Sequence, residues 1–243
     1  DQVVDADELH ARSAFAQLGA VLPTLTLTRS HRAGGEDLTN LVNTRFYDGA
    51  IQSLPWAGSF LGHSSLTYEF VRGGQGLPDQ QTGAVESTDA EVDRVVQLVL
   101  EHASERSGES LMVITASERH AVRVYQSVLQ AFSKFPQYRE FLLGERAEPF
   151  AVLTLEQATA QSRDRVIFSI GYGRTPHGRV LSNFGSLGQP GGERLLAVAM
   201  TRARRAMTIV SCFKPEDLDT ARIKHGVVVL AELLGFEHPA PAP

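Results

Sequence analysis

The chain has 243 residues, of which 42% are hydrophobic and 21% are charged, and its formal net charge is −5. This composition predicts one large domain with an ample core and excludes a globally basic nucleic-acid binder, although local contacts to nucleic acid stay open. The one cysteine, Cys212, excludes a disulfide framework and a thiolate metal cluster and fits a reducing, cytoplasmic setting. The sequence contains no transmembrane-length apolar run and no signal-peptide pattern, so no membrane contact is expected.

The N-terminal part of the chain predicts a connector, a short strand and a helix. Residues 1–20 form a weak helix pattern and would connect from a preceding domain, because the chain begins at Asp1 without Met. Residues 24–28 alternate in polarity and predict a strand, shortly before Arg32. Residues 36–47 carry apolar side chains at helical spacing. These segments would open an α/β domain.

The segment 52–87 is the least regular part of the sequence and is predicted to be an insertion or surface loop. A helix is predicted directly after it, at 88–107. Ser87 or Thr88 would cap this helix, and Glu91, three residues after Thr88, would complete a capping box.

The remaining chain alternates between strands and helices. Strands are predicted at 66–71, 111–115, 150–155 and 165–170, helices at 117–132, 135–143 and 227–234, and a loop at 171–191. This alternation predicts parallel pairing and a three-layer α/β sandwich. Residues 239–243, PAPAP, would be a linker to a following domain.

The stretch 195–212 organises the rest, because it combines a buried helix, a core strand and three arginines in four residues. Arg202, Arg204 and Arg205 are expected in the last turn of the helix. A guanidinium group cannot deprotonate and matches the planar array of oxygens on a phosphate. The alternative is that these arginines are solvated or paired with carboxylates.

Four segments in order resemble the motifs of superfamily 1 helicases. GGERLLAVAMTRARRAMTIVS (191–211) resembles motif VI, roughly RLNVAxTRAR and an apolar strand, and TLEQATAQSRDRVIFSIGYG (154–173) resembles motif V. SHR (30–32) with NTRFYDG (43–49) resembles motif IV of the nonsense-mediated-decay group, and LMVITAS (111–117) resembles a VITPY strand end. Since the sequence has neither a GxxxxGKS/T loop nor a DExx motif, it resembles only the second RecA-like domain of such a motor.

The resemblance implies roles for four residues near ATP. Arg202 would be the arginine finger and Arg32 a second γ-phosphate contact, while Glu156 would be a further ATP contact. Arg204 would contact either a phosphate or another domain through a salt bridge. ATP and Mg²⁺ would bind between this domain and a preceding RecA-like domain, no metal ligands are expected here, and the fragment alone should not hydrolyse ATP.

The resemblance also implies a track for single-stranded nucleic acid, DNA in the first instance. Thr115, Ser117 and Thr154 would contact its phosphates, since small hydroxyls let the backbone approach and read no base sequence. Their alternative role is to end strands. Tyr172 is the candidate for stacking on a base.

The sequence departs from motif V, where Gln-Gly and then an acidic residue are usual. Residues 159 and 160 are Thr and Ala here, and residues 161 and 162 are Gln and Ser. Losing the glycine restricts the backbone, so the coupling of hydrolysis to movement is in doubt.

The implied function is therefore that of the second RecA-like domain, spanning 21–215 with a C-terminal helix in 216–238, of an ATP-dependent helicase or translocase. The alternative is a degenerate RecA-like scaffold that binds protein or nucleic acid without ATP turnover. A Rossmann-type enzyme is weaker, because no GxGxxG follows a strand. Residues 171–173, 183–185 and 191–194 resemble a subgroup of large bacterial proteins, some with a nuclease-like domain after the helicase part.

Overall fold

A five-stranded, all-parallel sheet lies at the centre of the computed structural model, which describes residues 14–26, 28–30, 36–53 and 64–235. Its strand order is β3-β7-β6-β4-β5. The strands are β3 (Leu66–Phe70), β4 (Leu111–Thr115), β5 (Ala151–Thr154), β6 (Arg163–Ser169) and β7 (Ala203–Ser211). The predicted α/β class with a parallel sheet is confirmed.

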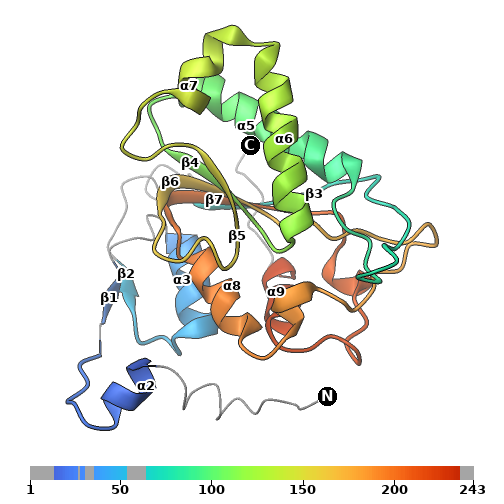
Figure 1. Cartoon of the computed structure of the whole chain (residues 1–243). Coiled ribbons are helices and arrows are strands. Elements are labelled where there is room, and N and C mark those ends of the chain that lie inside the picture. The colour runs from blue at the N-terminus through green and yellow to red at the C-terminus, as the bar shows by residue number, and fades with distance from the viewer. Residues whose placement is uncertain (1–13, 27, 31–35, 54–63, 236–243) are drawn as a thin grey trace.

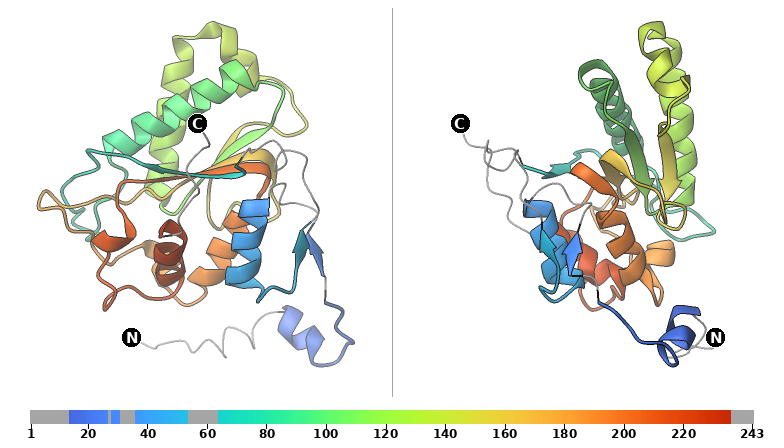
Figure 2. Two further views of the ribbon diagram at one scale, coloured as in Figure 1. Left: turned by 180° about the vertical axis from the view of Figure 1, so that it is seen from behind. Right: turned by 90° about the vertical axis from the view of Figure 1, so that its left-hand side faces the viewer.

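Helices cover both faces of the sheet and make the three predicted layers (Figures 1 and 2). One layer consists of α5 (Asp89–Glu105), α6 (Glu118–Ser133) and α7 (Arg139–Leu143), with η1 (Pro136–Tyr138) before α7. The other consists of α3 (Glu36–Phe46), α8 (Gly192–Met200) and α9 (Gly226–Leu234), with η2 (Gly185–Gly188) and η3 (Pro215–Asp217). The helices predicted at 36–47, 88–107, 117–132 and 227–234 therefore occur within two residues of their expected bounds, whereas the one predicted at 135–143 is divided into η1 and α7.

Strand β4 is buried on both faces, which explains why its sequence is a continuous apolar run. Leu111 and Val113 pack into the core under α5 and α6, whereas Met112 and Ile114 pack into the core on the α8 side. Both faces of a covered parallel sheet are buried, so both sets of alternating side chains must be apolar.

Helix α9 belongs to the same core as the sheet. Val227, Leu230 and Leu233 are buried in one cluster with Phe168 of β6 and Leu196 of α8. The C-terminal helix expected in 216–238 is thus an integral part of the α8-side layer.

Parallel pairing gives the sheet two chemically different edges. The first residues of all five strands line one side of the sheet, which we call the amino edge. Their last residues line the opposite side, which we call the carboxyl edge. Since β5 and β6 both run parallel to β4, the segment 155–162 must return from the carboxyl edge to the amino edge. Leu155 and Ala158 anchor this crossing segment in the core, and it delivers Gln161 and Ser162 to the amino edge.

The strand predicted at 24–28 is wrong. Residues 24–26 and 28 have no regular structure, and Leu25 is 91% exposed. The strand β1 (Arg29–Ser30) starts later and pairs in parallel with β2 (Gln52–Ser53), outside the main sheet. Alternating polarity predicts a strand only where a neighbouring strand offers pairing and burial. In the expected connector 1–20, the helix α2 (Ala14–Gly19) is present, and residues 1–13 lie outside the described chain.

The segment 52–87 is not wholly an irregular insertion, because β3 is an edge strand of the main sheet paired with β7. The capping box expected at the start of α5 is also wrong. The Thr88 hydroxyl makes no capping bond and instead lies 3.3 Å from the Cys212 thiol. Glu91 points into the core, where burial and other partners outweigh local capping.

Candidate functional site at the two edges of the sheet

The three arginines lie at the junction of α8 and β7, on the amino edge. The helix ends at Met200, Thr201 is its C-cap, and Arg204 and Arg205 are already in β7. They are therefore not in the last turn of the helix, as the sequence predicts. The Thr201 hydroxyl donates to the carbonyls of Ala197 and Val198, which satisfies acceptors of the final turn.

The Arg202 guanidinium is half-buried between the end of α8 and the crossing segment. Its Nε donates to the Val198 carbonyl at 2.9 Å, and Nη1 donates to the Gln161 carbonyl at 3.3 Å. Nη2 donates to the Thr201 hydroxyl at 2.9 Å. These three bonds orient the side chain and join the two segments that resemble motifs V and VI.

Arg204 belongs to an ion-pair network inside the domain. It donates to both carboxylate oxygens of Glu148 and to Asp164 Oδ1 at 3.2 Å. The Ser110 and Ser162 hydroxyls accept further bonds at 3.1 and 3.2 Å. The bond from Arg204 lowers the pKa of Glu148. In this structure its guanidinium is thus occupied by neighbouring side chains and not presented to a nucleotide.

Asp164 and Arg205 complete this network. Burial would raise the pKa of Asp164, but hydrogen bonds from Ser110 and the charge of Arg204 outweigh it and lower the pKa. Arg205 is exposed and bonds Glu109 at 2.8 Å, which also pairs with Arg165.

The crossing segment keeps a backbone conformation that suits glycine although glycine is absent. Ala160, which stands where motif V usually has glycine, has a φ of +64°. The replacement therefore leaves a left-handed residue in place, at a cost of about 1–2 kcal/mol for a residue with a Cβ atom. The carbonyl of the next residue, Gln161, is the one that Arg202 binds.

The residues expected near ATP do not gather at one edge. Glu156 is exposed just beyond β5 on the carboxyl edge, so the length of the sheet separates it from Arg202. Burial raises the pKa of Glu156, but hydrogen bonds from Ser186, its own backbone and Thr154 lower it overall. Arg32 lies outside the described residues.

The three hydroxyl residues expected to contact nucleic acid do meet at the carboxyl edge, where Thr115 and Thr154 are register partners. Their hydroxyls, however, serve the fold in this structure. Thr115 is completely buried and donates to the Ser117 carbonyl at 2.8 Å. Ser117 caps α6 and donates to Glu86 at 2.6 Å, and Thr154 accepts from the Gln157 amide at 3.4 Å.

Tyr172 is not the exposed ring that stacking on a base requires. It is 5% exposed and packs on Phe184 with the ring centroids 4.8 Å apart. That expectation is therefore wrong, because the loop 171–191 folds back on the core.

A buried polar chain under the carboxyl edge escaped sequence reasoning. Ser169 donates to Glu91 Oε1 at 2.7 Å, and the Gly171 amide donates to the same oxygen at 2.8 Å. Since Ser169 uses its only proton on Glu91, its oxygen accepts from His120 Nε2, 2.8 Å away. His120 Nδ1 then accepts from Ser87, also at 2.8 Å. The helical spacing of Glu91 among valines in α5 was the available signal.

The fit of these residues to ATP and Mg²⁺ follows from their donor types. The amino edge offers guanidinium N–H groups, which suit phosphate oxygens. Within the described ranges, no group of three or more His, Cys, Asp or Glu side chains could hold a metal ion. The chain therefore fits an accessory phosphate contact, and its described residues do not make a Mg²⁺ site. No helix in these same ranges is long and apolar enough to cross a membrane.

Comparison with known proteins gives distant similarity to helicases. The sequence matches no family model. It is 27% identical over 201 residues to an uncharacterized ATP-dependent helicase of Mycoplasma genitalium, a match that covers 79% of this chain and only 16% of that protein. The chain thus spans about a sixth of the length of this relative.

Two solved structures give weak matches. The C-terminal domain of a possible DNA helicase from Lactobacillus plantarum matches 82% of this chain and 96% of its own, with a TM-score of 0.40 and 16% identity. The large terminase of bacteriophage HK97 matches 79% of this chain and 34% of its own, with a TM-score of 0.37 and 9% identity. The sequence match to the mycoplasma helicase is the firmer of these likenesses.

Proposed function

We propose that this chain is the second RecA-like domain, covering 21–215 and the C-terminal helix in 216–238, of an ATP-dependent helicase or translocase. The observation that carries the proposal is the position of Arg202. Neutral oxygens of Val198, Thr201 and Gln161 hold it at the amino edge, where the helicase-like motifs V and VI meet. The distant similarity to an ATP-dependent helicase supports the same function.

In this proposal the amino edge faces a preceding RecA-like domain that holds ATP and Mg²⁺. Bound ATP supplies the phosphoryl group that is transferred to water. Arg202 then places its guanidinium against the γ-phosphate oxygens, where negative charge spreads in the transition state. By analogy with other arginine fingers, this contact is worth roughly a thousandfold or more in rate.

The other residues of the amino edge have supporting roles. Ser162 and Asp164 hold Arg204, so Arg204 stiffens the start of β7 beside the finger. Arg32 remains a proposed second phosphate contact. Glu156 lies at the carboxyl edge and is therefore not proposed as an ATP contact. We place the single-stranded nucleic acid at this edge, where Thr154 is the least buried of the three predicted hydroxyl contacts.

The test is ATP hydrolysis by the full-length parent protein, with and without single-stranded DNA. A motor is expected to hydrolyse ATP faster when DNA is present. If the parent has an intact Walker lysine and acidic motif but shows no stimulated hydrolysis, the degenerate scaffold replaces the motor, and the substituted crossing segment would be its cause.

A further inference from the structure

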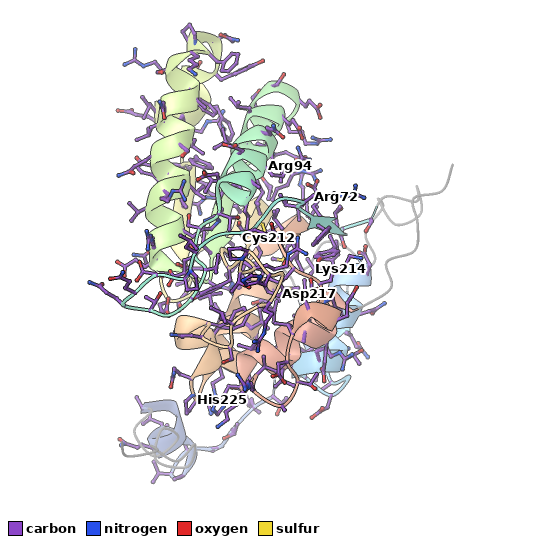
Figure 3. All side chains as sticks on the ribbon, turned by 90° about the vertical axis from the view of Figure 1, so that its right-hand side faces the viewer. Arg72, Arg94, Cys212, Lys214, Asp217 and His225 are labelled. Atoms are coloured by element: carbon purple, nitrogen blue, oxygen red, sulfur yellow. The ribbon has the colours of Figure 1, made fainter. Side chains whose placement is uncertain are left out.

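Two cationic side chains lie against one phenyl ring where β3 and β7 end, and a third follows two residues after the ring in the chain. The Arg174 guanidinium and the Lys214 ammonium group each lie 5.5 Å from the centroid of the Phe70 ring. Arg72 is exposed, two residues after Phe70. Figure 3 shows Arg72 and Lys214 on the same side of the molecule. We call Arg72, Arg174, Lys214 and Phe70 the cationic pad.

The parallel pairing of β3 with β7 brings the parts of the pad together. Phe70 is the register partner of Ser211, so the residues that follow both strands emerge side by side at the carboxyl edge. The turn after β3 lies against the end of β7, because a Cβ atom on Gly74 would come within 2.3 Å of the Cys212 side chain. Arg174 is tied to this turn, since its amide donates to the Gly74 carbonyl at 2.9 Å.

Arg174 is a half-buried cation that lacks an anion in the described part of the chain. Its Nε is buried and has no hydrogen-bond partner, and its side chain forms no ion pair with a described residue. Arg94 is shown on the same side of the molecule in Figure 3 and differs, because Glu69 and Glu101 bind it at 2.6 and 3.1 Å. Because Nε itself is shielded from solvent, an oxyanion would bind the terminal Nη atoms of this guanidinium group, whose charge no described carboxylate balances.

The two flanking cations extend this site over the surface. Arg72 makes no hydrogen bond or ion pair with a described residue. Lys214 approaches Glu216 at 3.6 Å, and both side chains are at least half exposed, so this pair is weak. The face of Phe70 attracts both cations that lie against it, which offsets part of their repulsion. All three cations therefore keep charge that an oxyanion could use.

The position of the pad favours a nucleic-acid phosphate over a nucleotide phosphate. The pad lies on the carboxyl edge, whereas Arg202 lies on the amino edge. Thr154 ends the outer strand β5 at the other end of the carboxyl edge, four strand spacings or about 19 Å from β3. Cations that are spread over a surface can each contact a different phosphate of a nucleic-acid backbone. Such contacts do not depend on the base sequence.

We propose that Arg174, flanked by Arg72 and Lys214, binds the phosphodiester backbone of single-stranded nucleic acid at the carboxyl ends of β3 and β7. The proposal rests on the proposed function for the identity of the ligand. It adds a second contact point, so a single strand would cross the carboxyl edge from the end of β5 to the end of β3.

The experiment measures the affinity of the full-length parent for a fluorescently labelled single-stranded DNA over a series of salt concentrations. Arg174→Gln removes the anchor charge, and the double variant Arg72→Ala, Lys214→Ala removes the two exposed charges with little risk to folding. Arg106→Ala is the matched control. Arg106 is an exposed arginine directly after α5, and within the described chain it pairs only with its neighbour Glu105.

We expect Arg174→Gln and the double variant each to bind about tenfold more weakly, equally for different base sequences. The slope of log affinity against log salt should fall by about one for each phosphate that the variant no longer binds. The control should keep the wild-type affinity and slope. This change in slope distinguishes the removal of a phosphate-binding cation from a structural defect.

Two results would overturn the proposal in distinguishable ways. If wild type binds the strand and both variants keep its affinity and salt slope, the pad does not bind the strand, while the proposed function stands. If wild type does not bind the single-stranded DNA at all, the nucleic-acid part of the proposed function fails together with the pad.

Discussion

The Glu91 carboxyl group and the His120 imidazole are both completely buried, with Oε1 and Nε2 3.9 Å apart and the Ser169 hydroxyl bonded to each. This pair is not an ordinary salt bridge. Burial raises the pKa of Glu91 to about 7, against hydrogen bonds from Gly171 and Ser169. Burial and the charge of Arg123 lower the pKa of His120 to about 3. Both groups are therefore mostly neutral in weakly acidic solution.

The raised pKa of Glu91 predicts that the fold loses stability as the pH rises from the unfolded pKa of this carboxyl group towards neutrality. The folded chain holds this proton more tightly than the unfolded chain, whose value is 4.5, so stability is lost as the pH rises from 4.5 through 7. The loss is on the order of 3 kcal/mol. Glu91→Gln should remove it, so the variant should gain stability over wild type across this range in urea unfolding.

His120 opposes this trend and must be separated from it. Its unfolded value is 6.5, so its contribution is present above that pH and is lost as the pH falls towards 3. Cys212 also faces this cluster, but burial raises the pKa of its thiol, so the thiol stays protonated throughout this pH range. The surface variant Glu105→Gln is the control. A difference between Glu91→Gln and wild type that does not vary with pH would show that Glu91 is not buried as a neutral acid.

Gly171 should not tolerate a side chain. Its φ is +76°, and an added Cβ atom would lie 2.7 Å from the His120 ring. Gly83 has a similar φ of +65° but open space around its Cβ position. Gly171→Ala should therefore cost at least about 2 kcal/mol more than Gly83→Ala, since overpacking adds to the shared backbone strain. Equal losses in thermal unfolding would contradict the close approach.

Ala160→Gly should stabilise the chain by about 1 kcal/mol, because glycine removes the strain of a left-handed alanine. Denaturant unfolding measures this gain. Ala147→Gly, at a position without a positive φ, should give no comparable gain. A loss of stability in Ala160→Gly would show that the crossing segment has another conformation.

Asp164→Ala should cost on the order of 2 kcal/mol, since it leaves the buried Ser110 amide without its acceptor and weakens the hold on Arg204. Arg205→Ala removes an exposed guanidinium that pairs with Glu109 at 2.8 Å and lies 3.6 Å from Asp164 Oδ1, and it should cost less than about 1 kcal/mol. The difference should shrink as the pH falls, because the lowered pKa of Asp164 means that its contribution is lost on protonation. Similar costs for the two variants would contradict a structural role for the Arg204 network.

The layers of the fold could be predicted from the sequence because local patterns and burial agree there. The run 111–115 and the amphipathic stripe of α6 each point to one structure. The absence of a strand at 24–28 could not be predicted, because alternating polarity does not show whether a neighbouring strand is available for pairing. Glu91 matched a local capping pattern, but the core offered it better partners than the end of the helix did.

The candidate site shows the same division. The proposed phosphate contact of Arg202 rests on its residue type and on the resemblance to helicase motifs. The opposite edges of Arg202 and Glu156 follow only from the parallel direction of β5 and β7, and the pad follows only from the pairing of β3 with β7. Distant segments build both features, so no single stretch of sequence carries their pattern.

The most direct test of the account compares Arg202→Ala with Arg205→Ala in the full-length parent, by measuring ATP affinity and the maximal rate of DNA-stimulated hydrolysis. Arg205 is an exposed neighbouring arginine on β7 that pairs with the half-buried Glu109, so it controls for the loss of charge. The account predicts that Arg202→Ala binds ATP but hydrolyses it a hundredfold or more slowly, by roughly the size of an arginine-finger effect, while Arg205→Ala resembles wild type. Hydrolysis by Arg202→Ala within a few-fold of wild type would contradict it.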